Sequence, residues 1–324
     1  MEVKLHAARS LVGRLRGAAA VHDGAATAVA IAEIRHATKD DPGHPGAARG
    51  RRGGALTAPS AASEDAAAAL LNISISARGQ LMSAPGLLDA LTAALRADEY
   101  CAAHHAAATV YSLLCVEANR PVVGARRPLL AALVSLLRAA PNTRATKDAL
   151  KALFAVALHP PNRATLVGLG AVQALFALIM TDGRSGIMED ATAVVAQVAG
   201  CAESLDAFTR MSGLRILVDL VEQGGASTPR TRENAAAALL NLVVAGGERA
   251  VAEVIAVGGA EDAVRELAED ATASARGKAK AESLLRALEC GGARRREHRL
   301  ADFLNGLVQS DPYISSPASA STHG

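Results

Sequence analysis

Few side chains of this sequence stand in a pattern that supports catalysis. His104 and His105 are the only adjacent histidines, but neighbouring residues on a helix point about 100° apart, so the pair does not readily chelate one metal ion. The glycine-rich residues 50–54 lack the Gly-Lys-Ser/Thr ending of a phosphate-binding loop. No Ser, His or acidic residue has the spacing of a nucleophile elbow. We therefore expect no catalytic residue, no metal site, no cofactor and no small-molecule ligand.

The charged residues do not favour a nucleic acid or a membrane as the partner. The chain has 324 residues, with 34 Lys and Arg against 32 Asp and Glu, which gives a net charge of +2. Arginines cluster at residues 49–52 and 294–299, either as nuclear-import or anionic-surface signals or as solvated loop and tail. Aromatic residues make up only 2%, so bases would find few stacking partners. No run of about 18 apolar residues occurs, so we expect no membrane span.

Cysteine usage indicates a reducing compartment. Cys101, Cys115, Cys201 and Cys290 lie too far apart for a metal knuckle and within apolar stretches, so we expect them to be small core residues. The N-terminal segment contains arginines but no continuous apolar core, which argues against a secretory signal and leaves a transit peptide as the alternative. We expect a cytoplasmic or nuclear location, or both.

The elements that position any functional residue must be helices. Hydrophobic residues make up 50% of the chain, yet there is no Trp and there are only three Tyr and four Phe. A core built from Ala, Leu and Val favours helices, because sheet cores rely on aromatic and β-branched residues. The composition predicts an all-α protein.

An internal repeat organises these helices. Residues 63–73 (SEDAAAALLNI) nearly match residues 232–242 (RENAAAALLNL), and the same register occurs four more times. The last apolar residue of each copy, here called the anchor, recurs at spacings of 40, 43, 42, 44 and 46 residues. The anchors are Ile73, Leu113, Val156, Val198, Leu242 and Leu288.

A second element recurs between the anchors, a Gly or Pro followed by a leucine-rich helix. It begins at Gly86, Pro128, Gly170, Gly213 and Gly259. A unit of about 42 residues with two long helices and one short helix has the size of an armadillo or HEAT repeat. Each such unit exposes an apolar face that stacking buries against the next unit.

The sequence resembles the armadillo family through the glycine ahead of the second helix and the Ala-Ala-x-Ala-Leu-x-Asn-Leu pattern of the third. Within that family, residues 233–242 (ENAAAALLNL) and 131–138 (AALVSLLR) are similar to the repeats of plant U-box ubiquitin ligases. The resemblance implies a right-handed superhelix, an α-solenoid of about six armadillo repeats. We expect a degenerate first repeat with a Gly/Pro/Arg-rich insertion at 1–60, the array at 61–290, and a basic segment with a Ser/Pro-rich disordered tail at 291–324.

The resemblance also implies a function in protein binding, through a concave groove lined by the third helices. No stretch resembles the Cys-Pro-Ile opening of a U-box, so we expect this chain to be non-catalytic and to supply substrate recognition in U-box-type ubiquitination. The alternatives are a non-ligase armadillo adaptor in signalling and, more weakly, an enzyme with an unrecognised site.

Two sets of groove residues follow from the resemblance. In the family, an asparagine just before the anchor binds the main chain of an extended peptide, and a tryptophan four residues earlier stacks on its side chains. The tryptophan position holds Lys151 in one repeat and small residues in the others, so we expect no continuous ladder for nuclear-localisation peptides. The asparagine position reads Asn72, Ser112, Ala155, Gln197, Asn241 and Ala287.

A second row lies on the same face, closer to the start of each third helix. We interpret this row as a mixed, mostly acidic lip that favours a partner with basic side chains. The alternative is that acids in a helix's first turn merely offset the positive end of the helix dipole. The row comprises Asp65, His105, Asp148, Asp190, Asn234 and Lys280, each preceded by a second polar residue or Ala, including His104 and Lys147.

Overall fold

The computed structural model describes residues 59–97, 100–222 and 227–291, and every regular element in these ranges is a helix. Nearly all of the predicted first repeat with its insertion, and of the predicted basic segment and tail, lies outside the described residues. The helices are α3 (Pro59–Ser76), α4 (Arg78–Met82), α5 (Leu87–Arg96), α6 (Tyr100–Leu114), α7 (Asn119–Gly124), α8 (Arg127–Ala139), α9 (Thr143–Ala157), α10 (Pro161–Gly168), α11 (Ala171–Thr181), α12 (Ser185–Val198), α13 (Ser204–Arg210), α14 (Gly213–Val221), α15 (Pro229–Val257), α16 (Ala260–Glu269) and a helix over 275–291.

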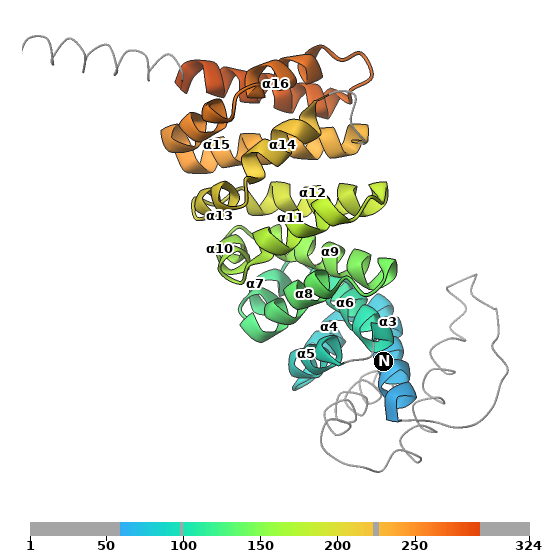
Figure 1. Ribbon diagram of the computed structural model, residues 1–324. Coiled ribbons are helices and arrows are strands. Elements are labelled where there is room, and N and C mark those ends of the chain that lie inside the picture. The colour runs from blue at the N-terminus through green and yellow to red at the C-terminus, as the bar shows by residue number, and fades with distance from the viewer. Residues whose placement is uncertain (1–58, 98–99, 223–226, 292–324) are drawn as a thin grey trace, which may run out of the picture.

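The helices form a stack of three-helix units, which confirms the predicted α-solenoid (Figure 1). Helices α4, α5 and α6 make one unit, and each following unit repeats a short first, a longer second and a long third helix. The third helix of one unit and the first helix of the next run together in α15, which is broken at Gly247 (φ 58°, ψ −144°). The described part thus holds five complete units, preceded by α3, which has the place of a third helix.

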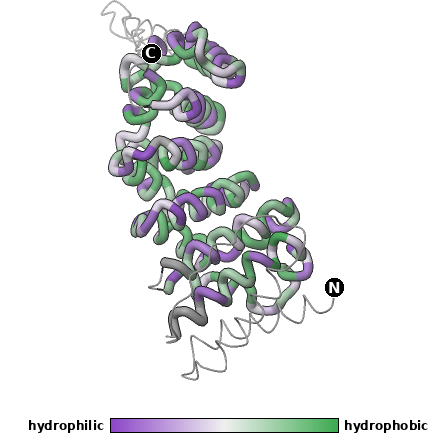
Figure 2. Tube along the Cα trace, turned by 90° about the vertical axis from the view of Figure 1, so that its right-hand side faces the viewer, coloured by the Kyte–Doolittle hydropathy of each residue, from purple (hydrophilic) through white to green (hydrophobic). Residues whose placement is uncertain are grey.

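Equivalent helices of successive units lie against one another. The third helices α3, α6, α9, α12 and α15 contact each other in that order, as do the second helices α5, α8 and α11 and the first helices α7, α10 and α13. We call the exposed side of the third helices the third-helix face. Figure 2 shows apolar and polar residues interleaved along every helix, as stacking requires.

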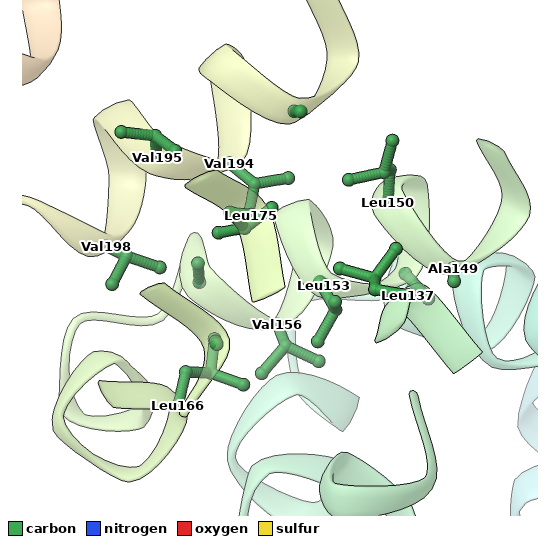
Figure 3. Close-up of a cluster of buried hydrophobic side chains, with 14 of the residues drawn as sticks. Leu137, Ala149, Leu150, Leu153, Val156, Leu166, Leu175, Val194, Val195 and Val198 are labelled. Carbon is green, nitrogen blue, oxygen red and sulfur yellow. The ribbon is translucent and has the colours of Figure 1, made fainter. Parts of the chain in front are cut away.

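The core runs the length of the stack and consists of alanine, leucine and valine with few aromatic residues. All six anchors are buried, at most 2% exposed, so the register predicted from the repeat is confirmed. Figure 3 shows part of this core, in which Leu153 and Val156 of α9 and Leu137 of α8 belong to one cluster with Val194 of α12 in the next unit.

The glycine ahead of the second helix has a conformational reason. Gly86, Gly170 and Gly259 immediately precede α5, α11 and α16 with φ of 76°, 79° and 73°, a region that only glycine enters at low cost. At α14 the expected glycine is displaced by one residue, and Ser212 takes φ 53° instead. Gly213 is needed there for space, because a Cβ would lie 2.7 Å from the ring of Phe176.

The prediction that the cysteines are core residues is wrong for two of them. Cys115 and Cys290 are exposed and Cys201 is partly buried, where burial raises the pKa of the Cys201 thiol. Cys115 and Cys290 lie two residues beyond the buried anchors Leu113 and Leu288. Residues two positions apart on a helix point about 200° apart around its axis. When the anchor points into the core, the residue two positions later therefore points toward solvent.

No single helix of the described ranges is long and apolar enough to cross a membrane. Helices α10 and α11 together are long and apolar enough, judged by length and composition alone, but they are bent by 70° relative to each other.

Candidate partner-binding face

The third-helix face is hollowed where α3, α6 and α9 meet. The hollow has a volume of about 470 Å³ and is open to solvent on one side. Helix α9 supplies most of its wall, and α3 and α6 supply the rest. The lining residues are Leu71, His104, Ala108, Thr143, Arg144, Lys147, Asp148 and Lys151.

Helix α9 places four charged residues on one side. Arg144, Lys147, Asp148 and Lys151 follow the three- and four-residue spacing that aligns side chains along a helix face. The helix begins at an N-cap, Asn142, whose side chain accepts a hydrogen bond from the Ala145 N–H at 2.9 Å. Its first turn holds no acidic residue, so the positive end of the helix dipole borders the hollow without a local counter-charge.

The charges in the hollow are only partly paired. The Asp148 carboxylate lies 3.5 Å from Lys151 Nζ and 3.7 Å from His104 Nδ1, and its side chain is 14% exposed. Within the described ranges, neither Arg144 nor Lys147 makes a side-chain hydrogen bond or ion pair. The hollow thus holds three cations and one carboxylate, and among the described residues Arg144 and Lys147 have no partner.

The adjacent histidines lie with their rings against each other. The rings of His104 and His105 are 3.9 Å apart between centroids and tilted by 38°. His104 is 8% exposed, and its Nδ1 makes no hydrogen bond. Among the described residues, no three or more His, Cys, Asp or Glu side chains are grouped so as to hold a metal ion.

Two predicted groove residues are bonded to neighbouring helices. Ser112 on α6 is buried, and its hydroxyl donates to the Ser74 carbonyl at 3.1 Å and accepts from Arg78 Nε at 3.3 Å. Gln197 on α12 accepts from Arg163 Nη2 at 3.4 Å. Ser112 thereby joins its unit to the one before it, whereas Gln197 is bonded to the first helix of its own unit.

The two predicted asparagines of α15 bond the third helix of the preceding unit, as Ser112 does. Asn241 donates from Nδ2 to the Ala196 carbonyl of α12 at 2.7 Å. Asn234 donates to the Glu189 carbonyl at 3.0 Å and to Thr192 Oγ1 at 3.2 Å. These amides thus satisfy backbone and hydroxyl groups of the adjacent third helix.

The remaining predicted residues are partly buried on the third-helix face. Asn72 and Asp190 make no side-chain hydrogen bond or ion pair within the described ranges, whereas Asp65 and His105 each have an interaction. The helix-dipole explanation of the acids is wrong, because α3, α9 and α12 have no acidic residue in the first turn. The acidic lip stays a prediction. Of the residues named for the groove, His104, Lys147, Asp148 and Lys151 lie together in the hollow.

Polar residues near the C-terminal third helices are closely paired. Glu233 on α15 accepts hydrogen bonds from Ser274 Oγ at 2.7 Å and Lys280 Nζ at 3.0 Å. Burial acts to raise the pKa of Glu233, but the hydrogen bonds from Ser274 and Lys280 outweigh it and hold the pKa below its usual value. Thr228 likewise donates to Glu189 Oε1 at 2.7 Å.

A buried ion pair joins Arg232 of α15 to Asp270, the residue after α16. Their side chains are only 7% and 4% exposed, and Arg232 Nε also donates to the Val221 carbonyl at 2.9 Å. Hydrogen bonds from Thr272 and from Arg232 lower the pKa of Asp270 to about 2. This pair ties the end of α14 to the end of α16.

An Asn-Arg pair caps the C-terminal ends of two third helices, a feature that the sequence pattern did not predict. Asn119 and Asn162, each six residues after an anchor, donate to the anchor carbonyls of Leu113 and Val156 at 2.8 and 3.0 Å. The arginine that follows each asparagine donates to the next carbonyl. The twice-repeated Asn-Arg at a fixed distance from the anchor was the available signal.

The second of these asparagines also reaches the preceding unit. Asn162 Nδ2 lies 3.0 Å from the Arg120 carbonyl. A Cβ at Gly124, the last residue of α7, would overlap the Asn162 amide. Gly124 and Asn162 therefore fit together as a pair.

Comparison with known proteins places this geometry in a family. Residues 57–290 match the sequence family described as the plant U-box protein ARM repeat region. The chain is 30% identical over 256 residues to U-box domain-containing protein 16 of Arabidopsis thaliana, covering 78% of this chain and 36% of that protein. It is 29% identical over 157 residues to U-box domain-containing protein 8 of the same plant, covering 48% and 40%. The chain thus spans about 40% or less of these relatives.

A solved structure with the same fold is the designed armadillo repeat protein YIII(Dq.V1)4CPAF in complex with peptide (KR)4. It superimposes with a TM-score of 0.61 at 18% identity, covering 80% of this chain and 99% of that one. With anchors, glycine turns and stacked third helices in this register, and with the family match over residues 57–290, the chain belongs to the plant U-box protein armadillo-repeat family.

Proposed function

We propose that the third-helix face binds an extended segment of a protein partner, and that this binding provides substrate recognition in U-box-type ubiquitination. The observation that carries the proposal is the hollow between α3, α6 and α9, together with charged groups that the fold does not use. Arg144, Lys147 and Asp190 have no side-chain partner in the described ranges. Charged groups left unpaired on one continuous face are available to a ligand.

The family supports an extended protein segment as the ligand. The designed armadillo protein described above is in complex with the peptide (KR)4, so a protein of this fold can bind a basic peptide. In the present chain, Asp190 is a groove carboxylate outside the hollow that could meet a basic side chain. Complementary charge at this point would set the register of the partner.

Peptide selection tests the binding half of the proposal. A library of random twelve-residue peptides displayed on phage is selected against the chain, and the enriched peptides are measured by fluorescence polarisation. Asp190→Lys is expected to weaken peptides with a basic residue at a fixed position by about tenfold, because attraction becomes repulsion. Asp219→Lys on α14, outside the third-helix face, is the control with the same charge change. Unchanged affinity in the folded Asp190→Lys and Asp148→Lys variants would contradict the proposed lip.

Ubiquitin transfer tests the other half. The chain alone and the chain fused to the U-box of a relative are incubated with activating and conjugating enzymes and a reporter carrying a selected peptide. We expect ubiquitination of the reporter by the fusion only, and none when the peptide is scrambled. Peptide binding without ubiquitination by the fusion would favour a non-ligase adaptor. Activity of the chain alone would reveal a docking surface for the conjugating enzyme.

A further inference from the structure

We infer that the hollow between α3, α6 and α9 receives an anionic side chain of the partner segment, a carboxylate or a phosphate, which Arg144, Lys147 and Lys151 hold. The inference rests on the proposed function and names the chemistry of one of its contacts. It differs from the lip hypothesis, which concerns basic side chains, because it concerns this hollow alone.

Positive charges outnumber negative charges among the residues that line the hollow. Arg144, Lys147 and Lys151 line the hollow with a single carboxylate, Asp148. The Lys151 ammonium lies 3.5 Å from that carboxylate, so Lys151 offsets its charge. Arg144 and Lys147 remain without a protein partner in the described ranges, and an anion between them would bring two cations a counter-charge.

The second argument is a buried polar group beside these cations. His104 lines the hollow, is 8% exposed, and has an Nδ1 with no hydrogen-bond partner. A buried nitrogen without a partner lowers stability unless a ligand supplies one. The distance of 3.7 Å to Asp148 is too long for a hydrogen bond. The hollow therefore offers a polar contact that the folded chain leaves unmade.

The third argument is the direction of α9. Thr143 and Arg144 are its first two residues, and both line the hollow. The positive end of a fifteen-residue helix thus faces the same space, and helix N-termini stabilise anions. A volume of about 470 Å³ is ample for a carboxylate or a phosphate with its side chain.

Parallel selections test the inference. The phage library is selected against three proteins: the wild-type chain, Lys147→Glu/Lys151→Glu, and the control Arg127→Glu/Arg210→Glu. The control changes the net charge equally at exposed residues of α8 and α13. We expect Asp or Glu to be enriched at one peptide position with the wild type and the control, and to be lost with Lys147→Glu/Lys151→Glu. Thermal unfolding verifies that each variant is folded, and Lys147→Gln/Lys151→Gln serves as the milder replacement.

One enriched peptide then distinguishes the sources of the anion. Replacing its acidic residue by Gln should weaken binding to the wild type by about tenfold or more. The same replacement should not weaken binding to the Lys147→Glu/Lys151→Glu variant and should strengthen it, because the acid no longer faces the added carboxylates. Phosphoserine at that position binds more tightly than Glu if the hollow is built for phosphate, and less tightly if it is built for a carboxylate.

The selections distinguish a failure of the anion site from a failure of the proposed peptide-binding function. Enriched peptides with no acidic preference, and equal affinity for the wild type and Lys147→Glu/Lys151→Glu, would overturn the anion site while leaving the proposed function intact. If the wild type enriched no peptide at all, the proposed function itself would be contradicted, and the anion site with it.

Discussion

The two ends of the third-helix face use the same register for different purposes. At α12, α15 and the helix over 275–291, polar side chains bind neighbouring units, as Asn241 does to the Ala196 carbonyl and Glu233 to Lys280. At α3, α6 and α9, Ser112 also bonds the preceding unit, but Asn72, Arg144 and Lys147 make no such bond within the described ranges. Equivalent positions of a repeat protein can therefore hold the array together at one end and remain available to a ligand at the other.

The largest expected effect tests the cohesive end. Arg232→Ala should lower the free energy of unfolding more than the other substitutions, because it removes the ion pair with Asp270 and the hydrogen bond to the Val221 carbonyl and leaves Thr272 as the donor to the Asp270 carboxylate. Urea unfolding followed by circular dichroism measures the change, and hydrogen exchange should show α14 to α16 opening first. The exposed Arg230→Ala is the control. A loss of hydrogen-exchange protection spread evenly over the array would contradict a local effect of the ion pair.

Acid should weaken the same end. The pKa of Asp270 is lowered to about 2 and that of Glu233 is also below its usual value. A lowered pKa stabilises the fold at pH values above the unfolded pKa, about 4, and this stabilisation is lost as the pH falls through the folded value. The stability difference between wild type and Asp270→Asn should therefore be full at pH 7 and shrink between pH 4 and pH 2. Melting curves at pH 7, 4 and 2.5 would show it, and a constant difference would refute the linkage.

A matched pair of asparagines sharpens the comparison. Asn241→Ala should cost about 1 kcal/mol, since it removes the hydrogen bond to the Ala196 carbonyl. Asn72 occupies the same repeat position, and Asn72→Ala should cost less than about 0.5 kcal/mol, because Asn72 makes no side-chain bond within the described ranges. Equal losses in chemical denaturation would mean that the two ends do not differ.

The smallest expected effect concerns the hollow. Lys147→Ala should change the free energy of unfolding by no more than about 0.5 kcal/mol, since Lys147 has no bond to break in the described ranges. Removing a cation near Arg144 and Lys151 could even stabilise the fold slightly. Differential scanning calorimetry with Lys151→Ala alongside measures it. A large loss would show that Lys147 belongs to the scaffold.

The fold could be predicted from the sequence because it depends on a repeated pattern. The anchors and the glycines before the second helices recur at nearly constant spacing, and a buried apolar position has few alternatives. The exception at Ser212 arises because the ring of Phe176 needs the space at Gly213. That contact joins α11 and α14, and no local pattern encodes it.

The candidate site was predictable only in part. Helical spacing placed Asp148 and Lys151 on the correct face, yet it could not tell which polar groups the neighbouring unit would bind. Ser112 and Asn241 have the same repeat position as Asn72, and their partners Ser74 and Ala196 lie 38 and 45 residues away. Pairing at that distance depends on how units stack, which the residue type alone does not specify.

The fit between Gly124 and Asn162 limits how freely this array could be rearranged. The unit that contains α10 inserts its asparagine amide where the preceding unit must have a glycine. Exchange, duplication or deletion of whole units would separate this pair unless the neighbour also carried a glycine there. The units share one helix order, but the unit with Asn162 requires a glycine in the unit before it. Gene rearrangement and protein engineering alike would therefore have to move α7 to α12 as one block.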